Sequence, residues 1–93
     1  MSTNFEQVHN YYERLVFEEV LRRAQKHPDL MPDALADVAC VALNRLPARY
    51  VRHDVDLMFY LTEHERHAIA VSIEAALDFA FTFVTERSTR AEA

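Results

Sequence analysis

Five residues near the middle of the chain have side chains suited to binding an anion: Asn44, Arg45, Arg49, Tyr50 and Arg52. Guanidinium groups donate paired hydrogen bonds to phosphate oxygens and to the O6/N7 edge of guanine. Arginine and tyrosine also stack on bases, and the asparagine amide offers both a donor and an acceptor. These residue types predict a ligand-binding site for a nucleotide-like anion, formed by the same five residues.

The charge distribution favours a small cationic site in an otherwise anionic protein. Residues 38–53 contain three arginines and no Asp or Glu, so this segment carries +3, against −8 for the rest of the 93-residue chain. The net charge of −5 and the small size of the patch argue against binding to a DNA duplex or to a membrane surface. The alternative is that the arginines pair with acids on an ordinary surface, such as Asp37, Asp54 or Asp56. The charge pattern leaves both interpretations open.

A helix followed by a proline bend should position these arginines. The pattern predicts a helix from Pro32, a favoured first helical residue, to about Arg45, just before Pro47. Because proline restricts the direction of the chain, the arginines should emerge from a defined corner and not from a flexible loop. The centre of this helix, residues 38–43, is apolar nearly all round, so we expect it to be covered on more than one side.

A longer helix is predicted before it, over about residues 4–26. Its apolar residues recur at three- and four-residue spacing and are Phe5, Val8, Tyr12, Leu15, Val16 and Val20. Arg22, Arg23 and Lys26 lie at its end, where cations interact favourably with the helix dipole. The helix should stop before Pro28, since the residue that precedes a proline resists helical geometry.

The part of the chain after the proline bend contains β-prone residues and then a third long helix. We expect residues 48–61 to be irregular, with one or two short strands. Thr62 and Glu65 have the spacing of a capping box, which predicts the start of a helix. That helix should extend over about residues 63–86.

This third helix carries two apolar stripes, which is more than one small core can use. One stripe holds Ile69, Ile73, Ala76, Leu77, Ala80 and Val84. The other holds Ala68, Ser72, Ala75, Phe79 and Phe83. Leaving two phenylalanines exposed forfeits several kcal/mol at about 25 cal/mol per Å² of apolar area. We therefore expect the second stripe to contact a partner subunit, which makes the protein a homodimer.

The predicted fold is mainly α: a small three- to four-helix domain with a short irregular or β-like segment between the second and third long helices. The length fits a single domain over residues 1–93, with an ordered core over about 4–87 and a frayed polar tail over 88–93. We find neither an unbroken apolar run of membrane-spanning length nor a signal-peptide design, and expect a cytoplasmic protein. The absence of glycine excludes phosphate-binding P-loops and dinucleotide fingerprints.

Other residues with chemical potential give weaker patterns. His64 and His67, with two glutamates nearby, could form half of a metal site, but the pattern favours a solvated first helical turn whose acids suit the helix dipole, and we predict no metal. Cys40 could act as a nucleophile, but its apolar neighbours favour a buried, unreactive thiol. Since no other cluster has a distinctive spacing, we identify no catalytic residue and predict that the protein is not an enzyme.

Two motifs resemble the ComFB family of late competence development proteins. The family pattern is an N-x-x-E-x-x-V helix followed by D-[IV]-x-A-x-A-L-N-x-L-P-P-x-Y-V. Residues 10–16 match its first part as NYYERLV, and residues 37–51 follow its second part as DVACVALNRLPARYV, with Cys40 at the position of its first alanine. The resemblance extends over about residues 4–85. It places Asn44, Arg45, Arg49 and Tyr50 inside the signature, while Ala48 replaces its second proline.

The resemblance implies a function as well as a fold. The family is largely helical and dimeric, and some members are receptors for cyclic dinucleotides, notably cyclic di-GMP, that act as signalling adaptors without catalysis. Several members carry a cysteine cluster before the aspartate that is interpreted as a zinc site. Residues 29–36 contain no thiol here, so we expect no zinc and no cofactor.

The leading hypothesis is therefore a homodimeric receptor for a cyclic dinucleotide, with cyclic di-GMP favoured as the ligand and a downstream regulatory protein as a further partner. The alternative is a homodimeric protein–protein interaction module without a small-molecule ligand. Such a module would present Phe79 and Phe83, or the apolar residues 57–60, to its partner.

Overall fold

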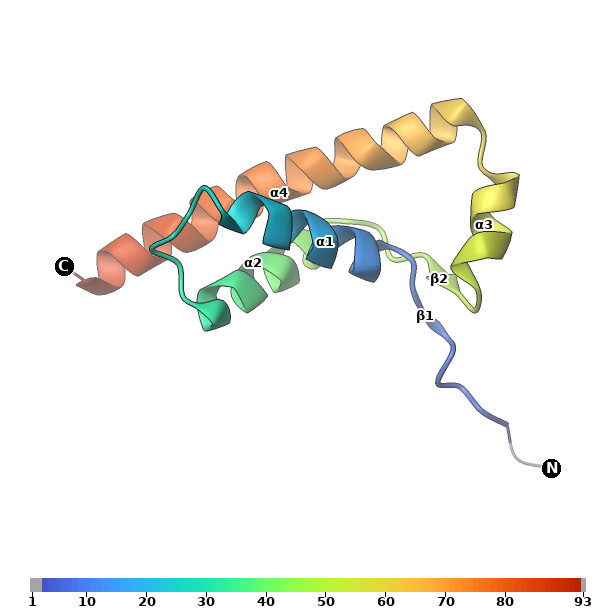
Figure 1. Cartoon of the computed structure of the whole chain (residues 1–93), viewed down its shortest axis with the longest axis horizontal. Helices are drawn as coiled ribbons and strands as arrows, with labels where there is room; N and C mark the ends of the chain where they lie inside the picture. The colour runs from blue at the N-terminus through green and yellow to red at the C-terminus, as the bar shows by residue number, and fades with distance from the viewer. Residues whose placement is uncertain (1–2, 93) are drawn as a thin grey trace.

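A computed structural model describes the backbone of residues 3–92 and the side chains of residues 3–88. In chain order the elements are β1 (His9–Asn10), α1 (Tyr12–Ala24), α2 (Pro32–Asn44), β2 (Tyr50–Val51), α3 (Asp54–Tyr60) and α4 (Glu63–Glu92) (Figure 1). The predicted fold class is confirmed: the protein is mainly helical, and a short β segment lies between the second and third long helices. Dimerisation stays a prediction.

Helix α2 has nearly the bounds that the sequence predicts. Pro32 occupies the first helical turn and follows Met31, whose backbone is extended. At the other end Arg45 caps the helix, and its N–H donates to the carbonyl of Ala42 at 3.0 Å. The chain then leaves the helix axis before Pro47, so the corner predicted for the arginines exists.

Helix α1 begins later than predicted. It starts at Tyr12 and not near residue 4, and Phe5, which should have lain on its apolar face, is 71% exposed. The residues just before α1 form strand β1 instead, which pairs antiparallel with β2. The register places His9 opposite Val51 and Asn10 opposite Tyr50. Periodicity cannot reveal this pairing because the partner strand is distant in sequence. The end of α1 at Ala24 agrees with the predicted stop before Pro28.

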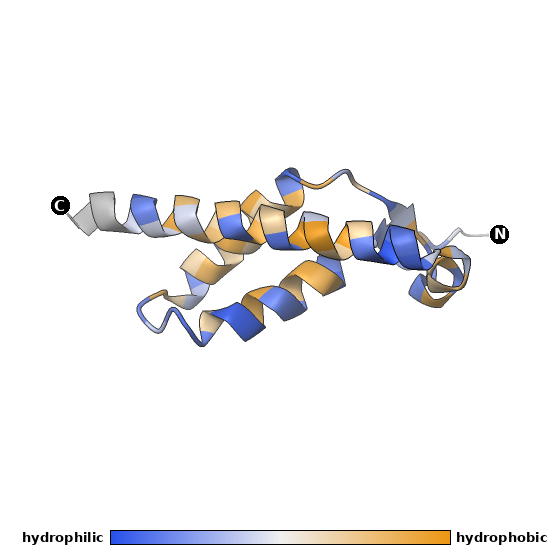
Figure 2. Cartoon of the chain, turned by 90° about the horizontal axis from the view of Figure 1, so that it is seen from above, coloured by the Kyte–Doolittle hydropathy of each residue, from blue (hydrophilic) through white to orange (hydrophobic). Residues whose placement is uncertain are grey.

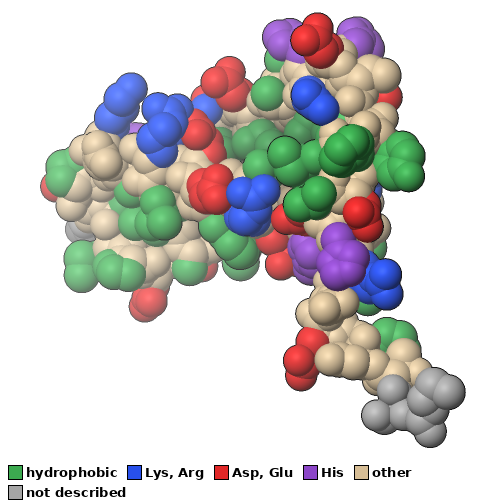
Figure 3. Space-filling model, turned by 45° about the vertical axis from the view of Figure 1, so that its right-hand side comes forward, with side chains coloured by type: hydrophobic (Ala, Val, Ile, Leu, Met, Phe, Trp, Pro, Cys, Tyr) green, Lys and Arg blue, Asp and Glu red, His purple; other side chains and the backbone are tan. Residues whose placement is uncertain are grey.

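The segment after the proline bend contains both a strand and a helix. The predicted short strand is confirmed at Tyr50–Val51, but residues 57–60, which are β-prone by composition, belong to helix α3. Asp54 and Asp56 lie in the first turn of α3, where acids interact favourably with the helix dipole. None of the seven residues of α3, all of which are described, is buried. Hydrophobic side chains gather at the end of the molecule that α3 occupies (Figure 3).

Helix α4 starts with the predicted cap and extends further than predicted. The N–H of Glu65 donates to the Thr62 hydroxyl at 3.1 Å, and this hydroxyl donates to the Glu65 carboxylate at 3.2 Å. The helix continues to Glu92, beyond the predicted end near residue 86, so the predicted frayed tail is helical as far as the structure describes it. Ala93 lies outside the described residues.

Part of α4, Glu63–Ser88, is long and apolar enough to cross a membrane by length and composition, with a mean hydropathy of 1.6 over an 18-residue window. The search for an unbroken apolar run in the sequence did not identify this segment, because polar residues interrupt it. A third of that window is buried inside the protein. The core helix of a soluble protein meets the same criterion, so a single such helix is weak evidence for a membrane.

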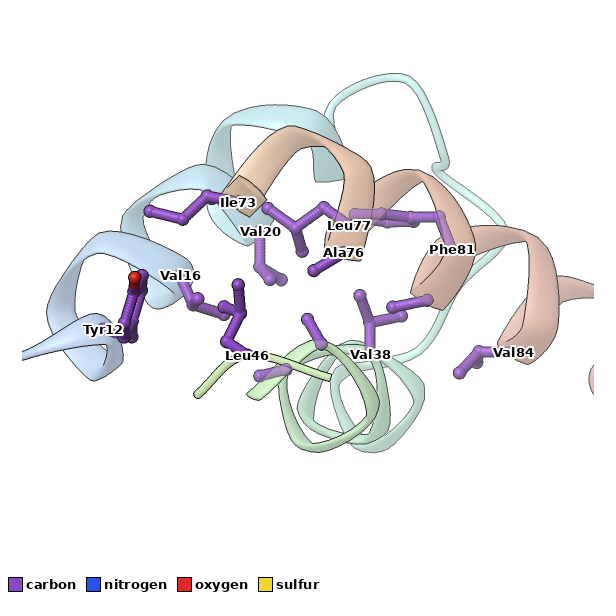
Figure 4. Close-up of a cluster of buried hydrophobic side chains, with 13 residues drawn as sticks. Tyr12, Val16, Val20, Val38, Leu46, Ile73, Ala76, Leu77, Phe81 and Val84 are labelled. Atoms are coloured by element: carbon purple, nitrogen blue, oxygen red, sulfur yellow. The ribbon is translucent and has the colours of Figure 1, made fainter. Parts of the chain in front are cut away.

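The core lies where α4 crosses α1 and α2 (Figures 1 and 4). The first predicted stripe of α4 is buried there, with Ile73, Ala76, Leu77, Ala80 and Val84 at its centre. Leu77 of α4, Val16 of α1 and Val38 of α2 are the largest side chains that are completely buried. Each such side chain stabilises the packed helices by about 1.5–3 kcal/mol. This packing holds the end of α2 at a fixed place beside α4.

Two apolar surfaces remain open. On α4, Phe79 and Phe83 of the second predicted stripe are 42% and 39% exposed, and apolar residues follow the helix along its length (Figure 2). Helix α2 contacts both α1 and α4, as its apolar centre required, but its face around Ala36 and Cys40 is exposed. The prediction that Cys40 is buried is therefore wrong, because neither neighbouring helix covers this face.

Candidate functional site

The five predicted ligand residues lie in residues 44–52, which we call the arginine segment. Asn44 is the last residue of α2, and Arg45 is its cap. Leu46 is buried in the core and fixes the start of the bend. The chain then reaches strand β2, which begins at Tyr50. The segment is thus held at one end by a packed helix and at the other by a strand pair.

Asn10, a buried residue on β1, holds the middle of the arginine segment. Its side-chain oxygen accepts the backbone N–H of Arg49 at 3.0 Å and that of Tyr12 at 3.2 Å. The N–H of Tyr11 donates to the carbonyl of Arg49 at 2.7 Å. Asn10 is only 7% exposed and is the one buried polar residue among the side chains described. The resemblance to ComFB included Asn10 as a fixed position, but the sequence alone gave it no structural role.

Arg45 lies against α4. Its guanidinium carbon is 3.8 Å from the centre of the Phe79 ring, a cation–π contact. The Phe79 ring stacks on Phe83 with centroids 5.8 Å apart and an interplanar angle of 18°. Arg87 lies over the Phe83 ring at 5.8 Å. Four planar groups therefore form a row along the exposed face of α4, which we call the Arg–Phe row.

The predicted residues fall into two groups. Asn44 and Arg45 belong to the end of α2, whereas Arg49, Tyr50 and Arg52 belong to or flank strand β2. Among the described residues, no hydrogen bond or ring contact joins Arg45 to the second group. All five side chains are exposed. They form an open surface and not an enclosed pocket in one copy of the chain.

The guanidinium groups of the arginine segment are not neutralised. Among the described side chains, neither Arg45 nor Arg49 nor Arg52 forms an ion pair with an acid. Asp54, which the surface interpretation offered as a partner, accepts hydrogen bonds from His9 at 2.6 Å and from Arg14 at 3.4 Å instead. The arginines therefore keep their charge available for a ligand.

His9 links the strand pair to α3. Its Nδ1 lies 2.7 Å from the carbonyl of Gln7, and its Nε2 lies 2.6 Å from the Asp54 carboxylate. Both neighbours are acceptors, so the doubly protonated ring, which has two donors, satisfies both. The Gln7 carbonyl and then the Asp54 carboxylate raise the pKa of His9, and the imidazolium in turn lowers the pKa of Asp54. The contact fixes the position of α3 just after Arg52.

A comparison with protein families matches residues 9–88 to the family described as late competence development protein ComFB. The chain belongs to the ComFB family. The ComFB match begins at strand β1 and ends within α4, so it includes the strand pair, the arginine segment and the Arg–Phe row. No curated protein and no solved structure matches the chain significantly.

Other candidate sites of this ComFB protein have less to support them. His64 and His67 are exposed on the first turns of α4, and no group of three or more His, Cys, Asp or Glu that could hold a metal is found among the described residues. Cys40 is exposed in an apolar groove of about 520 Å³ between α1 and α2, which Phe17 and Leu21 also line.

A second cavity, of about 680 Å³, lies beside the end of α1 and contains Arg22, Arg23 and Lys26. Asp78 and Glu86 also line it, and Glu19 and Asp78 pair with its two arginines. Its cationic groups are thus largely compensated.

Proposed function

We propose that this ComFB protein is a non-catalytic receptor for a cyclic dinucleotide, with cyclic di-GMP as the favoured ligand, and that it acts in the cytoplasm as a signalling adaptor. The observation that carries the proposal is the set of three guanidinium groups, Arg45, Arg49 and Arg52, that no acid neutralises among the described side chains. Family membership supports the same conclusion.

The chemistry of the segment fits such a ligand. Each phosphodiester carries one negative charge, so the three arginines can neutralise both phosphodiesters of a cyclic dinucleotide without a large basic surface. Tyr50 is 68% exposed and can stack on a base. Asn44 offers an amide to a base edge, and Asn10 keeps the backbone of Arg49 in place.

Calorimetric titration of cyclic di-GMP into the purified protein tests the proposal. We expect cyclic di-GMP to give a saturable heat of binding at micromolar concentrations. A separate titration with cyclic di-AMP tests the alternative ligand. If neither dinucleotide gives heat of binding at these concentrations, the proposed function is wrong.

A second candidate function is that of a protein–protein interaction module. The apolar side chains of α3 favour it, because Met58, Phe59 and Tyr60 are exposed and Phe59 reaches 84%. In that case a dinucleotide would not raise the melting temperature of the protein. A receptor is instead stabilised by its ligand, and Arg45→Ala and Arg49→Ala should abolish this stabilisation while leaving the fold intact.

A further inference from the structure

Asp54 is the acid closest in sequence to the arginine segment, because it lies only two residues after Arg52. His53, between them, has an extended backbone, and two residues of extended chain span about 7 Å. A free carboxylate at this distance would attract the Arg52 guanidinium and repel a phosphodiester, since salt screens charges only beyond about 8–10 Å. The positive charge that the arginine segment offers to a ligand therefore depends on what neutralises Asp54.

Two cationic side chains from the start of the protein occupy the Asp54 carboxylate. The Nε2 atom of His9, on β1, lies 2.6 Å from Oδ1, and the Nε atom of Arg14, on α1, lies 3.4 Å from Oδ2. Each carboxylate oxygen thus has its own donor. Arg14 also pairs with Glu18 at 3.1 Å. We call the side chains of His9, Arg14 and Asp54 the Asp54 clasp; it joins β1 and α1 to the start of α3, just after β2 (Figure 1).

The charge of the Asp54 clasp depends on the protonation of His9. Both ring nitrogens of His9 face acceptors, the Gln7 carbonyl and the Asp54 carboxylate, so the doubly protonated ring fits this position best. The Gln7 carbonyl, then Asp54 and also Glu13, raise the pKa of His9, while partial burial opposes them. With a charged His9 ring, the three side chains of the clasp carry a net charge of +1. With a neutral ring they carry none.

We infer that His9 and Arg14 are positioning residues for the proposed ligand site: they bind and neutralise the carboxylate beside Arg52, so that affinity for the dinucleotide depends on both side chains and falls when His9 loses its proton. This inference deepens the proposed receptor function and rests on it. Neither residue needs to touch the ligand, because both act through Asp54. By linkage, the bound ligand must in turn make His9 hold its proton more tightly.

The sign of the pH dependence follows from the charge of the clasp. The pKa of His9 lies above 6.5, so below that pH the ring is charged and ligand binding is strongest. As the pH rises through the pKa of His9 in the folded protein, the clasp loses one unit of positive charge and binding weakens. His53 is exposed beside Arg52 and titrates in the same range, so it needs its own control variant.

Calorimetric titration of cyclic di-GMP into the full chain at about pH 6 and about pH 8.5 tests the role of His9. We expect the dissociation constant to rise about two- to fivefold between the two pH values, the size expected for one partly screened charge near the ligand. His9→Gln, whose amide still donates to Asp54 but does not titrate, should lose most of this rise. His53→Gln should keep it. A rise that is absent from the original protein, or that His9→Gln retains in full, overturns the inference.

A rescue experiment tests the role of Arg14. At about pH 6, Arg14→Gln should weaken binding about two- to fivefold, whereas Arg22→Gln, which removes another largely exposed arginine that pairs with an acid on α1, should leave the affinity unchanged. Adding Asp54→Asn to Arg14→Gln should restore the affinity, because the uncompensated carboxylate is then gone.

This rescue distinguishes a charge effect from a loosened fold, since a second lost contact cannot repair a loosened fold. Circular dichroism melting checks that each variant is folded. A double variant that binds as weakly as Arg14→Gln overturns the inference, while the receptor function stands. An original protein that binds no dinucleotide at either pH removes both.

Discussion

Two regions of the molecule are rich in arginine, and they differ in what surrounds the guanidinium groups. At the end of α1, Arg22 and Arg23 both pair with Glu19, and Arg23 also binds Asp78 at 2.7 Å. In the arginine segment, none of the three arginines forms an ion pair among the described side chains. A phosphate that approaches α1 must displace carboxylates, whereas one that approaches the arginine segment meets free charge.

The difference has a simple origin in the sequence. On a helix, residues three and four apart are neighbours, so Glu19 reaches both Arg22 and Arg23. The arginines of α1 are therefore built into local pairs as soon as the helix forms. The arginine segment has no acid within its own stretch, and the nearest one after it, Asp54, is occupied by His9 and Arg14. Arginine count alone is a poor guide to a binding site, because the neighbouring acids decide how much charge is available.

The largest expected effect is on ligand affinity. Losing a hydrogen bond to a charged group costs about 1.5–3 kcal/mol. We therefore expect Arg49→Ala, and likewise Arg45→Ala, to weaken cyclic di-GMP binding by about ten- to a hundredfold in calorimetry. Arg22→Ala is the matched control from the other region and should leave the affinity within about twofold. Equal losses for Arg22→Ala and Arg49→Ala would show that the two regions do not differ in the way described.

The next effect concerns the residue that fixes the arginine segment. Asn10→Ala leaves the buried N–H of Tyr12 and the partly buried N–H of Arg49 without their acceptor, which should lower the free energy of unfolding by about 1–3 kcal/mol. Ligand affinity should fall as well, because Arg49 is no longer held. Denaturant unfolding and calorimetry measure the two losses. Asn10→Asp keeps an acceptor oxygen and should lose less of both. If Asn10→Ala unfolds at the same denaturant concentration as the original protein, the Asn10 contacts do not stabilise the segment.

A smaller effect on stability is expected for Glu19, the acid that pairs with the arginines of α1. Arg22 first, and Arg23 with it, lowers the pKa of Glu19 to about 2. Its stabilising contribution is therefore complete above about pH 4.5 and is lost as the pH falls through about 2. At neutral pH, Glu19→Gln should cost about 1 kcal/mol of unfolding free energy, since Arg22 is largely exposed. Affinity for the dinucleotide should not change. A clear loss of affinity in this variant would tie the end of α1 to the ligand site.

The smallest effect is a shift of one titration. The pKa of His9 is raised above 6.5, so the stability that its protonation contributes is complete below pH 6.5 and is lost as the pH rises through the folded value. The pKa of Asp54 is lowered below 3.8, so its contribution is complete above pH 3.8 and is lost on acidification. NMR titration of the His9 ring should give a midpoint above 6.5, and Asp54→Asn should lower it. A midpoint at or below 6.5 in the original protein would mean that His9 does not hold Asp54.

The sequence predicts those elements whose signals are local. The bounds of α2 follow from Pro32 and the proline bend, and the cap of α4 follows from the spacing of Thr62 and Glu65. The buried stripe of α4 follows from the three- and four-residue spacing of its apolar residues. In each case the residues that determine the structure lie within a few positions of one another, so no knowledge of the tertiary fold is needed.

The features that the sequence missed depend on distant partners. Strand β1 exists because Asn10 and its neighbours bond to β2, some forty residues later, so the apolar period starting at Phe5 misplaces the start of α1. Cys40 is exposed because α1 and α4, the helices that pack on α2, leave its face of α2 uncovered. The sequence predicts one site for the five candidate residues, but the contact of Arg45 with Phe79 separates Arg45 from the residues at β2, since side-chain direction after a helix end depends on the packed surface beside it.

The most direct test of the central claim is a map of ligand-induced shifts in the backbone amide NMR spectrum. We expect cyclic di-GMP to shift the amide signals of residues 44–52 and of those near Phe79, while the signals of residues 19–26 at the end of α1 stay in place. Shifts confined to residues 19–26, or a spectrum that the ligand leaves unchanged, would contradict it.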